Sequence, residues 1–168
     1  MADEPINIPI IDKNGNRIAI KRKALEMFTP YVDMIDQLGE EAYANGIPNQ
    51  YTEPETLEKI VEWCTHHMND PKEFPDDSPG QKAYLEEHAS GAFDETFMAG
   101  ISNEELPYLI SQVNHLQISS MLTALNREFA SRIKGKSPEQ IRNTFEMGPP
   151  LSEEEQERLR QEFAFVTQ

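Results

Sequence analysis

A helix end and a helix start stand within a few residues of each other in the segment IKGKSPEQIRNTF, residues 133–145. Gly135 can adopt the positive φ that commonly closes a helix. Ser137 and Gln140 have the spacing of a capping box, with a proline between them at the first helical position. The Gly-Pro-Pro run at 148–150 then stops the new helix near residue 147.

The terminal helix that begins there is short, and its surroundings must stabilise it. About ten residues are marginal as an isolated helix, so we expect this helix to dock on another element. Ile141 and Phe145, four residues apart, provide one small apolar face for docking. Ser152 and Glu155 form a second capping box, and we expect a second short helix from there to about Phe163. Two short helices with a narrow apolar seam predict a clamp for a partner.

The beginning of the chain predicts a small sheet. Asn14-Gly15 is a hairpin turn signal between two stretches in which isoleucine alternates with polar or small residues. A further short extended piece is expected around residues 47–48. The alternating isoleucines are Ile6, Ile8 and Ile10 before the turn, and Ile18 and Ile20 after it.

The rest of the chain predicts helices whose apolar residues recur at helical spacing. Residues 68–92 interrupt this pattern with three prolines and an excess of acidic residues, and they predict a mobile insertion. The predicted fold class is α+β: a small N-terminal sheet, a helical body and an extended helical C terminus. The expected helix start signals are Thr29-Pro30, Thr52 with Glu55, Ser102 with Glu105, and Ser119 or Ser120.

The net charge of −15 limits the kinds of partner. A surface that binds nucleic acid or anionic membrane needs clustered lysine and arginine, so we expect neither partner. No apolar run approaches 18 residues, and the start MADEPINIP lacks the features of a signal peptide, so we expect no membrane span. A single cysteine fits a reducing compartment, which predicts a cytoplasmic and nuclear location.

Residues that could carry chemistry lack the partners that chemistry needs. Cys64, His66 and His67 have no second ligand pair at zinc-site spacing, and we interpret the two histidines as solvated near a helix C terminus. Gly135-Lys136-Ser137 lacks the earlier glycine and the preceding strand of a phosphate loop. No Ser-His-Asp or Cys-His arrangement stands out. We therefore expect no catalytic, cofactor-binding or metal-binding residues, and a protein that is not an enzyme.

Three separated segments resemble the S-phase-kinase-associated adaptor family, which links F-box proteins to a cullin in SCF-type ubiquitin ligases. They are VEWCTHH followed by Asn-Asp-Pro, IKGKSPEQIRNTF, and LSEEEQERLRQE. The likeness extends over almost the whole chain. It implies a POZ/BTB-type domain at 1–117, with the insertion at 68–92 as its variable part, and F-box-binding helices at 118–168.

The resemblance also implies site residues. Asn114 and His115 fall in the helix that faces the cullin, and helical phasing places His115 opposite the apolar stripe. The chain departs from the family at His115, where tyrosine is usual, and in the PNQYT stretch after Ile47. Leu159 and Phe163 join the F-box-binding set because short terminal elements offer little to bury them. The full set is Leu106, Phe129, Ile133, Ile141, Phe145, Leu159, Phe163 and Phe165.

Two functions remain open at this point. The first is a non-catalytic adaptor that binds an F-box protein on one surface and a cullin N-terminal domain on another. The second is a POZ-like module that self-associates or acts as a scaffold without a cullin. In either case the apolar tail needs cover, so we expect the free protein to form a homodimer at high concentration.

Overall fold

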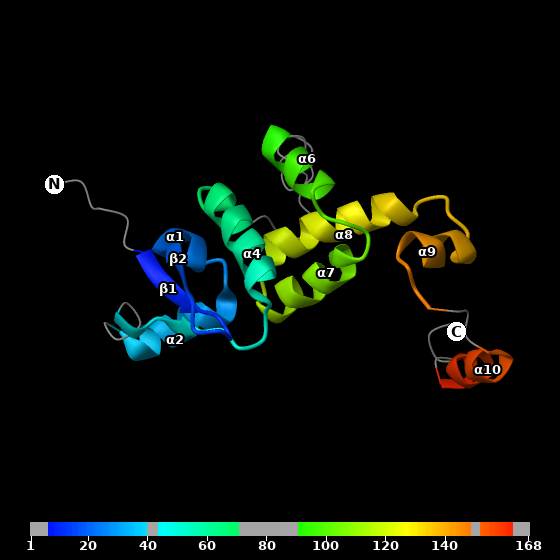
Figure 1. Ribbon diagram of the computed structural model, residues 1–168, viewed down its shortest axis with the longest axis horizontal. Coiled ribbons are helices and arrows are strands. Elements are labelled where there is room, and N and C mark those ends of the chain that lie inside the picture. Colours follow the sequence, from blue (N-terminus) through cyan, green and yellow to red (C-terminus); the bar gives the residue numbers. More distant parts are fainter. Residues whose placement is uncertain (1–6, 40–43, 71–90, 149–151, 163–168) are drawn as a thin grey trace, which may run out of the picture. The chain divides into compact units, whose positions relative to one another are not determined.

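The computed structural model describes residues 7–39, 44–70, 91–148 and 152–162 (Figure 1). The chain falls into two compact units, residues 1–132 and 133–168. The family resemblance implies a boundary after residue 117, and that boundary stays a prediction. Ile6 and most of the predicted insertion at 68–92 lie outside the described residues.

The first unit holds the sheet and most of the helices. Its small sheet and helical body agree with the predicted α+β class. In chain order its elements are β1 (Asn7–Ile11), β2 (Arg17–Lys21), α1 (Arg22–Leu25), α2 (Thr29–Leu38), β3 (Ile47–Pro48), α4 (Pro54–His67), α6 (Ala92–Ala99), α7 (Glu105–His115) and α8 (Ser119–Ile133), whose last residue belongs to the second unit.

The predicted hairpin forms the main part of the sheet. In the described part of the chain the strand order is β2-β1-β3. Strands β1 and β2 are antiparallel, and Ile8 pairs with Ile20. The Asp12 carboxylate fixes the turn, because it accepts hydrogen bonds from the backbone N–H groups of Asn14 and Asn16, both at 2.8 Å. Gly15 takes the positive φ, 83°, that the turn needs.

Strand β3 joins the sheet through a close backbone approach. It runs parallel to β1, with Ile47 opposite Ile10. Gly46 precedes it with φ +83°, and a Cβ atom at this position would lie 2.6 Å from the Pro9 carbonyl oxygen. Only glycine fits there without a shift of the backbone, so Gly46 sets where the chain enters the sheet.

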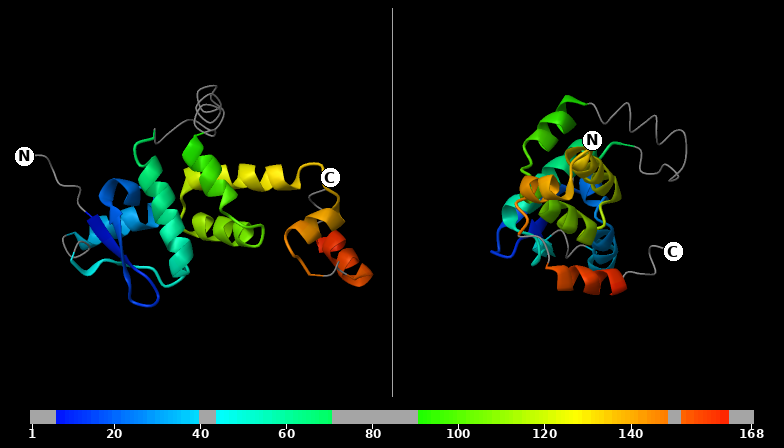
Figure 2. Two further views of the ribbon diagram at one scale, coloured as in Figure 1. Left: turned by 45° about the horizontal axis from the view of Figure 1, so that its top comes forward. Right: turned by 90° about the vertical axis from the view of Figure 1, so that its right-hand side faces the viewer.

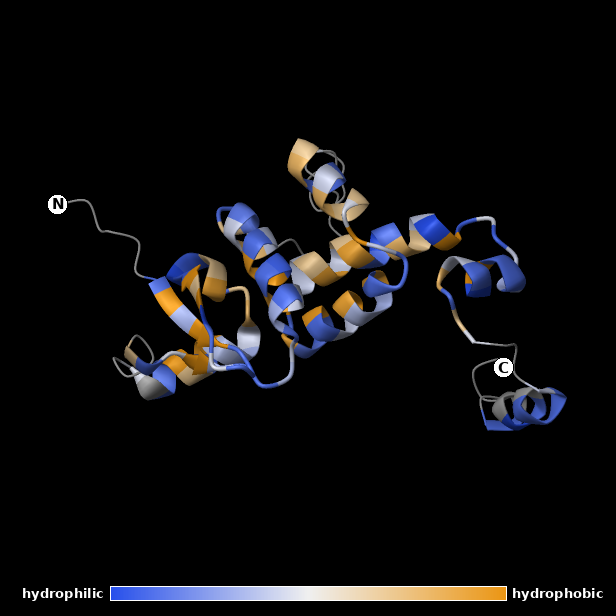
Figure 3. Ribbon diagram, viewed as in Figure 1, coloured by the Kyte–Doolittle hydropathy of each residue, from blue (hydrophilic) through white to orange (hydrophobic). Residues whose placement is uncertain are grey.

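Helix α4 packs against α1 and β2. Polar and apolar residues alternate along α4, α7 and α8, as expected for helices with one buried face (Figure 3). Helices α7 and α8 lie side by side in both views of Figure 2. The fully buried large side chains of the core come from the sheet, from α1, α4, α7 and α8, and from the residues just before α2 and α8: Phe28, Ile8, Ile10, Ile20, Leu25, Ile47, Leu57, Ile60, Leu106, Leu109, Ile118 and Met121.

The second unit contains two short helices, α9 (Pro138–Thr144) and α10 (Glu153–Glu162). Both predicted capping boxes are present. The Ser137 backbone N–H donates to Gln140 Oε1 at 2.8 Å, and Ser137 Oγ accepts from the Gln140 N–H at 3.2 Å. Ser152 and Glu155 repeat this exchange at 3.0 and 3.3 Å. Local capping chemistry therefore defines the start of each helix.

The predicted cap of α4 is wrong. Helix α4 begins at Pro54 after Glu53, and Glu53 makes no side-chain cap bond. Thr52 is instead fully buried, and its hydroxyl donates to Gln112 Oε1 on α7 at 3.1 Å. The tertiary partner outcompetes the local capping interaction, because a buried hydroxyl must be hydrogen-bonded. None of the described helices has the length and apolar character needed to cross a membrane.

Candidate partner-binding surfaces

The C-terminal end of α7 presents Asn114 and His115, and both are exposed. The opposite side of the helix is in the core, where Leu109 and Val113 have no exposed surface. This arrangement follows from the spacing of the apolar residues and agrees with the exposure expected for His115. The helix thus exposes an amide and an imidazole to solvent, while its opposite side is packed in the core.

The backbone just beyond His115 is also fixed. Gln117 adopts the left-handed conformation with φ 53°, and its N–H donates to the Asn114 carbonyl at 3.1 Å. The N–H of Ile118 donates to the Val113 carbonyl at 3.2 Å. The hydroxyl of Thr29, from α2, donates to the Gln117 carbonyl at 3.2 Å. These bonds satisfy the last carbonyls of α7 and limit motion at the position of His115.

A tight turn after β3 lies against this helix end. Asn49, which is 2% exposed, accepts hydrogen bonds on Oδ1 from the N–H groups of Tyr51 and Thr52 at 3.1 and 2.9 Å. The N–H of Asn49 itself donates to the Ile11 carbonyl at 2.7 Å. Through the Thr52–Gln112 hydrogen bond the turn is tied to α7. The side chain of Asn49 thus makes the backbone bonds of an Asx turn.

The buried phenol of Tyr31 supports the same turn. Burial raises the pKa of Tyr31 to about 12, although a hydrogen bond with the Asn49 side chain opposes the rise. The phenol therefore stays neutral throughout the physiological pH range, and its hydrogen bond to Asn49 persists.

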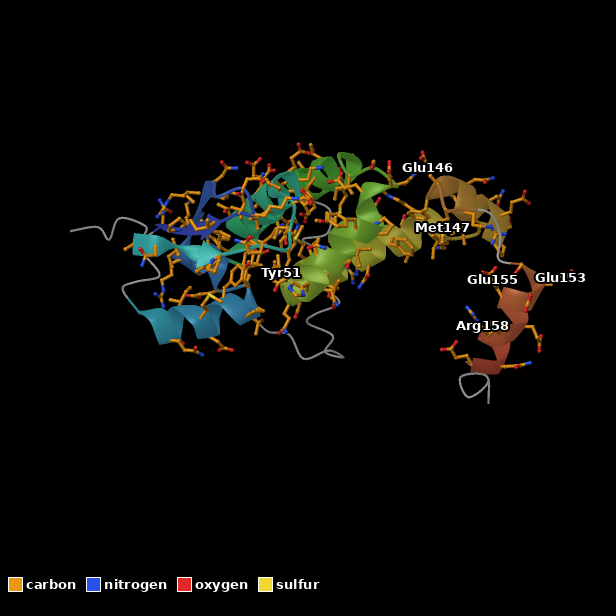
Figure 4. The ribbon with its side chains drawn as sticks, turned by 60° about the horizontal axis from the view of Figure 1, so that its bottom comes forward. Tyr51, Glu146, Met147, Glu153, Glu155 and Arg158 are labelled. Atoms are coloured by element: carbon orange, nitrogen blue, oxygen red, sulfur yellow. The ribbon has the colours of Figure 1, made fainter. Side chains whose placement is uncertain are left out.

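The turn brings Tyr51 into contact with α7. The ring centroids of Tyr51 and His115 are 5.3 Å apart, with the rings edge to face at 65°. This separation and angle are typical of a favourable aromatic pair. Tyr51 is 75% exposed, and Figure 4 shows it at the surface of the first unit beside the end of α7.

The second unit carries both apolar and acidic features. Ile133 and Ile141 are half-buried, and Phe145 is only 7% exposed. Glu153, Glu155 and Arg158 are exposed on α10 (Figure 4). Hydrogen bonds from the backbone and then the side chain of Ser152 hold the pKa of Glu155 below its ordinary value, which keeps this capping carboxylate ionised.

A histidine bracketed by two carboxylates joins α4 to α6. His67 Nδ1 lies 2.6 Å from Asp70 Oδ2, and its Nε2 lies 2.9 Å from Asp94 Oδ1. The ring stacks on Trp63 at 4.1 Å. Only 11% of the His67 side chain is exposed, so its interpretation as a solvated residue is wrong, whereas the neighbouring His66 is exposed. The two ring nitrogens can both donate a hydrogen bond to these carboxylates only when each nitrogen carries a proton.

Comparison with known proteins identifies the family. Residues 7–69 match the model of the Skp1 family tetramerisation domain, of the POZ type, and residues 119–165 match that of the Skp1 family dimerisation domain. A relative from Arthroderma otae, named E3 ubiquitin ligase complex SCF subunit sconC, is 32% identical over 155 residues, which cover 92% of this chain and 91% of the relative. The chain belongs to the Skp1 family.

Other relatives that carry the same name show the same breadth of similarity. The protein from Talaromyces marneffei is 33% identical over 145 residues, covering 86% of this chain and 87% of its own. The protein from Aspergillus terreus is 34% identical over 149 residues, covering 89% of each chain. Membership of the Skp1 family confirms the resemblance inferred from three sequence segments and the predicted POZ-type α+β fold.

The predicted site residues of this Skp1-family chain lie in different settings. Asn114 and His115 are adjacent and exposed at one helix end. Of the F-box-binding set, Phe129, Ile133 and Ile141 are half-buried. Leu106 is fully buried in the core of the first unit, and Phe145, in the second unit, is 7% exposed. The side chain of Leu159, and the whole of Phe163 and Phe165, lie outside what the structure describes. The binding roles of all these residues stay predictions.

Two features of this Skp1-family chain were missed in the sequence. Tyr51 and its turn were read only as a departure from the family pattern, although Asn49 two residues before Tyr51 has the spacing of an Asx turn. The carboxylates around His67 come from residues 70 and 94, and no local sequence pattern predicts that both lie next to this histidine. Within the described ranges no group of three or more His, Cys, Asp or Glu side chains is arranged to hold a metal ion.

Proposed function

We propose that this Skp1-family chain is a non-catalytic adaptor of an SCF-type E3 ubiquitin ligase. It links an F-box protein to the N-terminal domain of a cullin and performs no chemical step itself. The relatives support this role, because each is named as an SCF subunit of an E3 ubiquitin ligase complex. We also propose that it works in the cytoplasm and the nucleus.

The observation that carries the cullin side is the exposed, fixed end of α7. Asn114 and His115 offer hydrogen-bond donors and acceptors there, and the surrounding backbone bonds restrict their motion. A surface that is already ordered loses little conformational entropy on binding, which favours a stable complex with a rigid partner domain.

The F-box side rests on the C-terminal helices. Phe129 and Ile133 on α8, and Ile141 on α9, keep part of their apolar surface accessible. Leu106 and Phe145 are buried, which leaves almost no surface on either residue for direct contact with a partner. Helix α9 depends on its capping box and on packing against other residues. We therefore expect an F-box protein that covers the apolar side of α9 to bind a helix that is already formed and to stabilise it further.

A double lysine variant tests the cullin side. Asn114→Lys with His115→Lys adds two positive charges at the end of α7, and burying unpaired amines against a partner should weaken cullin binding by at least about thirtyfold. The matched control is Asn126→Lys with Ala130→Lys, two exposed positions on α8 that receive the same added charge. Isothermal titration calorimetry with a cullin N-terminal domain, and separately with an F-box domain, measures both affinities.

The expected result is loss of cullin binding in the first variant alone, with its F-box affinity unchanged. If that variant binds the cullin domain as tightly as the wild type, the end of α7 is not the contact surface. If the wild type binds no cullin domain at all, the adaptor proposal is wrong.

Self-association is a second candidate function, and the family models favour it. The model that matches residues 7–69 describes a tetramerisation domain, and the model that matches residues 119–165 describes a dimerisation domain. We propose that the free chain forms a homodimer through its C-terminal region and that an F-box domain displaces the second copy. Sedimentation equilibrium should show a dimer at about 100 μM that becomes a one-to-one heterodimer on addition of the F-box domain. A strict monomer at that concentration would refute this candidate.

A further inference from the structure

Tyr51 stands out among the exposed side chains of the first unit. At 75% exposure it is the most exposed of the large hydrophobic residues in the described ranges, ahead of Met147 at 59% and Tyr108 at 37%. A single exposed aromatic residue needs no explanation by itself. What distinguishes Tyr51 is the structure that holds it and the residue that it contacts.

The backbone of Tyr51 is held by buried polar groups. Its N–H donates to Asn49 Oδ1, and the next N–H, of Thr52, donates to the same atom. Asn49 and Thr52 are 2% and 0% exposed, and the Thr52 hydroxyl anchors the turn to Gln112 on α7. Such a ring is presented on an ordered backbone, so binding a partner through it requires little further ordering.

The ring of Tyr51 is continuous with the end of α7. Its centroid lies 5.3 Å from that of His115. At this distance a protein surface that covers the imidazole of His115 also covers the phenol ring. The nearest acidic side chain in sequence, Glu53, forms an ion pair with Lys13, which reduces the local negative charge. The two adjacent rings give this part of the surface an aromatic character.

We propose that Tyr51 is an anchor residue of the cullin-binding surface, inserting its ring into an apolar pocket of the cullin N-terminal domain next to the contact made by His115. The inference rests on the proposed adaptor function and adds a loop residue from another part of the chain to the helix end. Tyrosine is among the residues that most often dominate interface energetics, because its large ring is buried with few rotatable bonds to fix.

The test compares Tyr51→Ala with the wild type in calorimetry against a cullin N-terminal domain. The alanine variant should lose at least about tenfold in affinity, and Tyr51→Phe should stay within about threefold because it keeps the ring. Met147→Ala, which removes another highly exposed apolar side chain from the second unit, should leave cullin affinity unchanged. F-box affinity and thermal stability should be the same in the wild type, Tyr51→Ala and Tyr51→Phe.

A double-mutant cycle of Tyr51→Ala with His115→Ala tests whether the two rings act together. Residues in contact should give non-additive losses in cullin affinity. Strictly additive losses would contradict the shared anchor. A Tyr51→Ala protein that binds cullin within twofold of the wild type, while Asn114→Lys with His115→Lys abolishes binding, would overturn the inference and leave the adaptor function standing. An equal loss of F-box binding would show a general folding defect and would also overturn it. Absence of cullin binding in the wild type would remove the adaptor function itself.

Discussion

Replacing Phe145 with alanine should destabilise the second unit without weakening the F-box contact of molecules that remain folded. Phe145 follows α9 directly, is 7% exposed, and its N–H donates to the Ile141 carbonyl at 3.1 Å. A buried phenylalanine removes on the order of 150–200 Å² of apolar surface from water, which corresponds to about 4–5 kcal/mol. Partial burial in the unfolded chain reduces this to about 3 kcal/mol, within the usual range for such truncations.

Hydrogen exchange measures this effect locally. A loss of about 3 kcal/mol should increase the opening equilibrium of the α9 amides roughly a hundredfold. The amides of α4, in the first unit, serve as an internal reference. Ile141→Ala is the matched variant on the same helix, and because Ile141 is only half-buried its effect should be clearly smaller.

The opposite pattern would refute the reasoning. If exchange in α9 stays within about threefold of the wild type while F-box affinity falls by about thirtyfold or more, Phe145 is a direct partner contact. Its burial in the free chain would then be a poor guide to its role. Calorimetry at a temperature where the variant is still folded gives the affinity separately from stability.

Two further predictions concern ionisable groups of the first unit. Burial tends to raise the pKa of Asp12, but hydrogen bonds from the Asn16 side chain and from the backbone of Asn16, Asn14 and Gly15 outweigh burial and lower it. The ionised Asp12 should stabilise the fold fully above the ordinary aspartate pKa, about 4, and this effect should disappear as pH falls through the lower folded-state pKa. In Asp12→Asn, the free energy of unfolding, measured by denaturant titration at a series of pH values, should therefore fall less steeply toward acid pH. Replacing His67 with alanine should ease local opening of α6 by about 2 kcal/mol and change the fluorescence of Trp63, the only tryptophan, whereas Glu62→Ala, an exposed change on the same helix, should do neither.

Local sequence signals predicted the elements of this fold well. The Asn14-Gly15 turn, the two capping boxes of the C-terminal helices and the Ser102 contact with the Glu105 N–H at 3.0 Å all appear where the residues indicated. Each depends on groups only a few residues apart, so local interactions are enough to specify it.

Interactions between distant residues were not predictable in the same way. Thr52 has the spacing of a helix cap, yet it bonds Gln112, 60 residues further along the chain. Asp94 contacts His67, which lies 27 residues earlier in the chain. Tyr51, in the turn after β3, contacts His115 at the end of α7. These contacts depend on how α4, α6 and α7 pack, and periodicity says which face of a helix is buried but not what covers it.

Co-sedimentation of the chain with an F-box domain and a cullin N-terminal domain tests the central claim most directly. An adaptor with two separate surfaces should form a single one-to-one-to-one complex, and neither partner should displace the other. Binding of each partner should also leave the affinity for the other unchanged within about twofold, because independent sites have no coupling free energy. Mutually exclusive binding, or a complex that contains an F-box domain and never a cullin domain, would contradict the account.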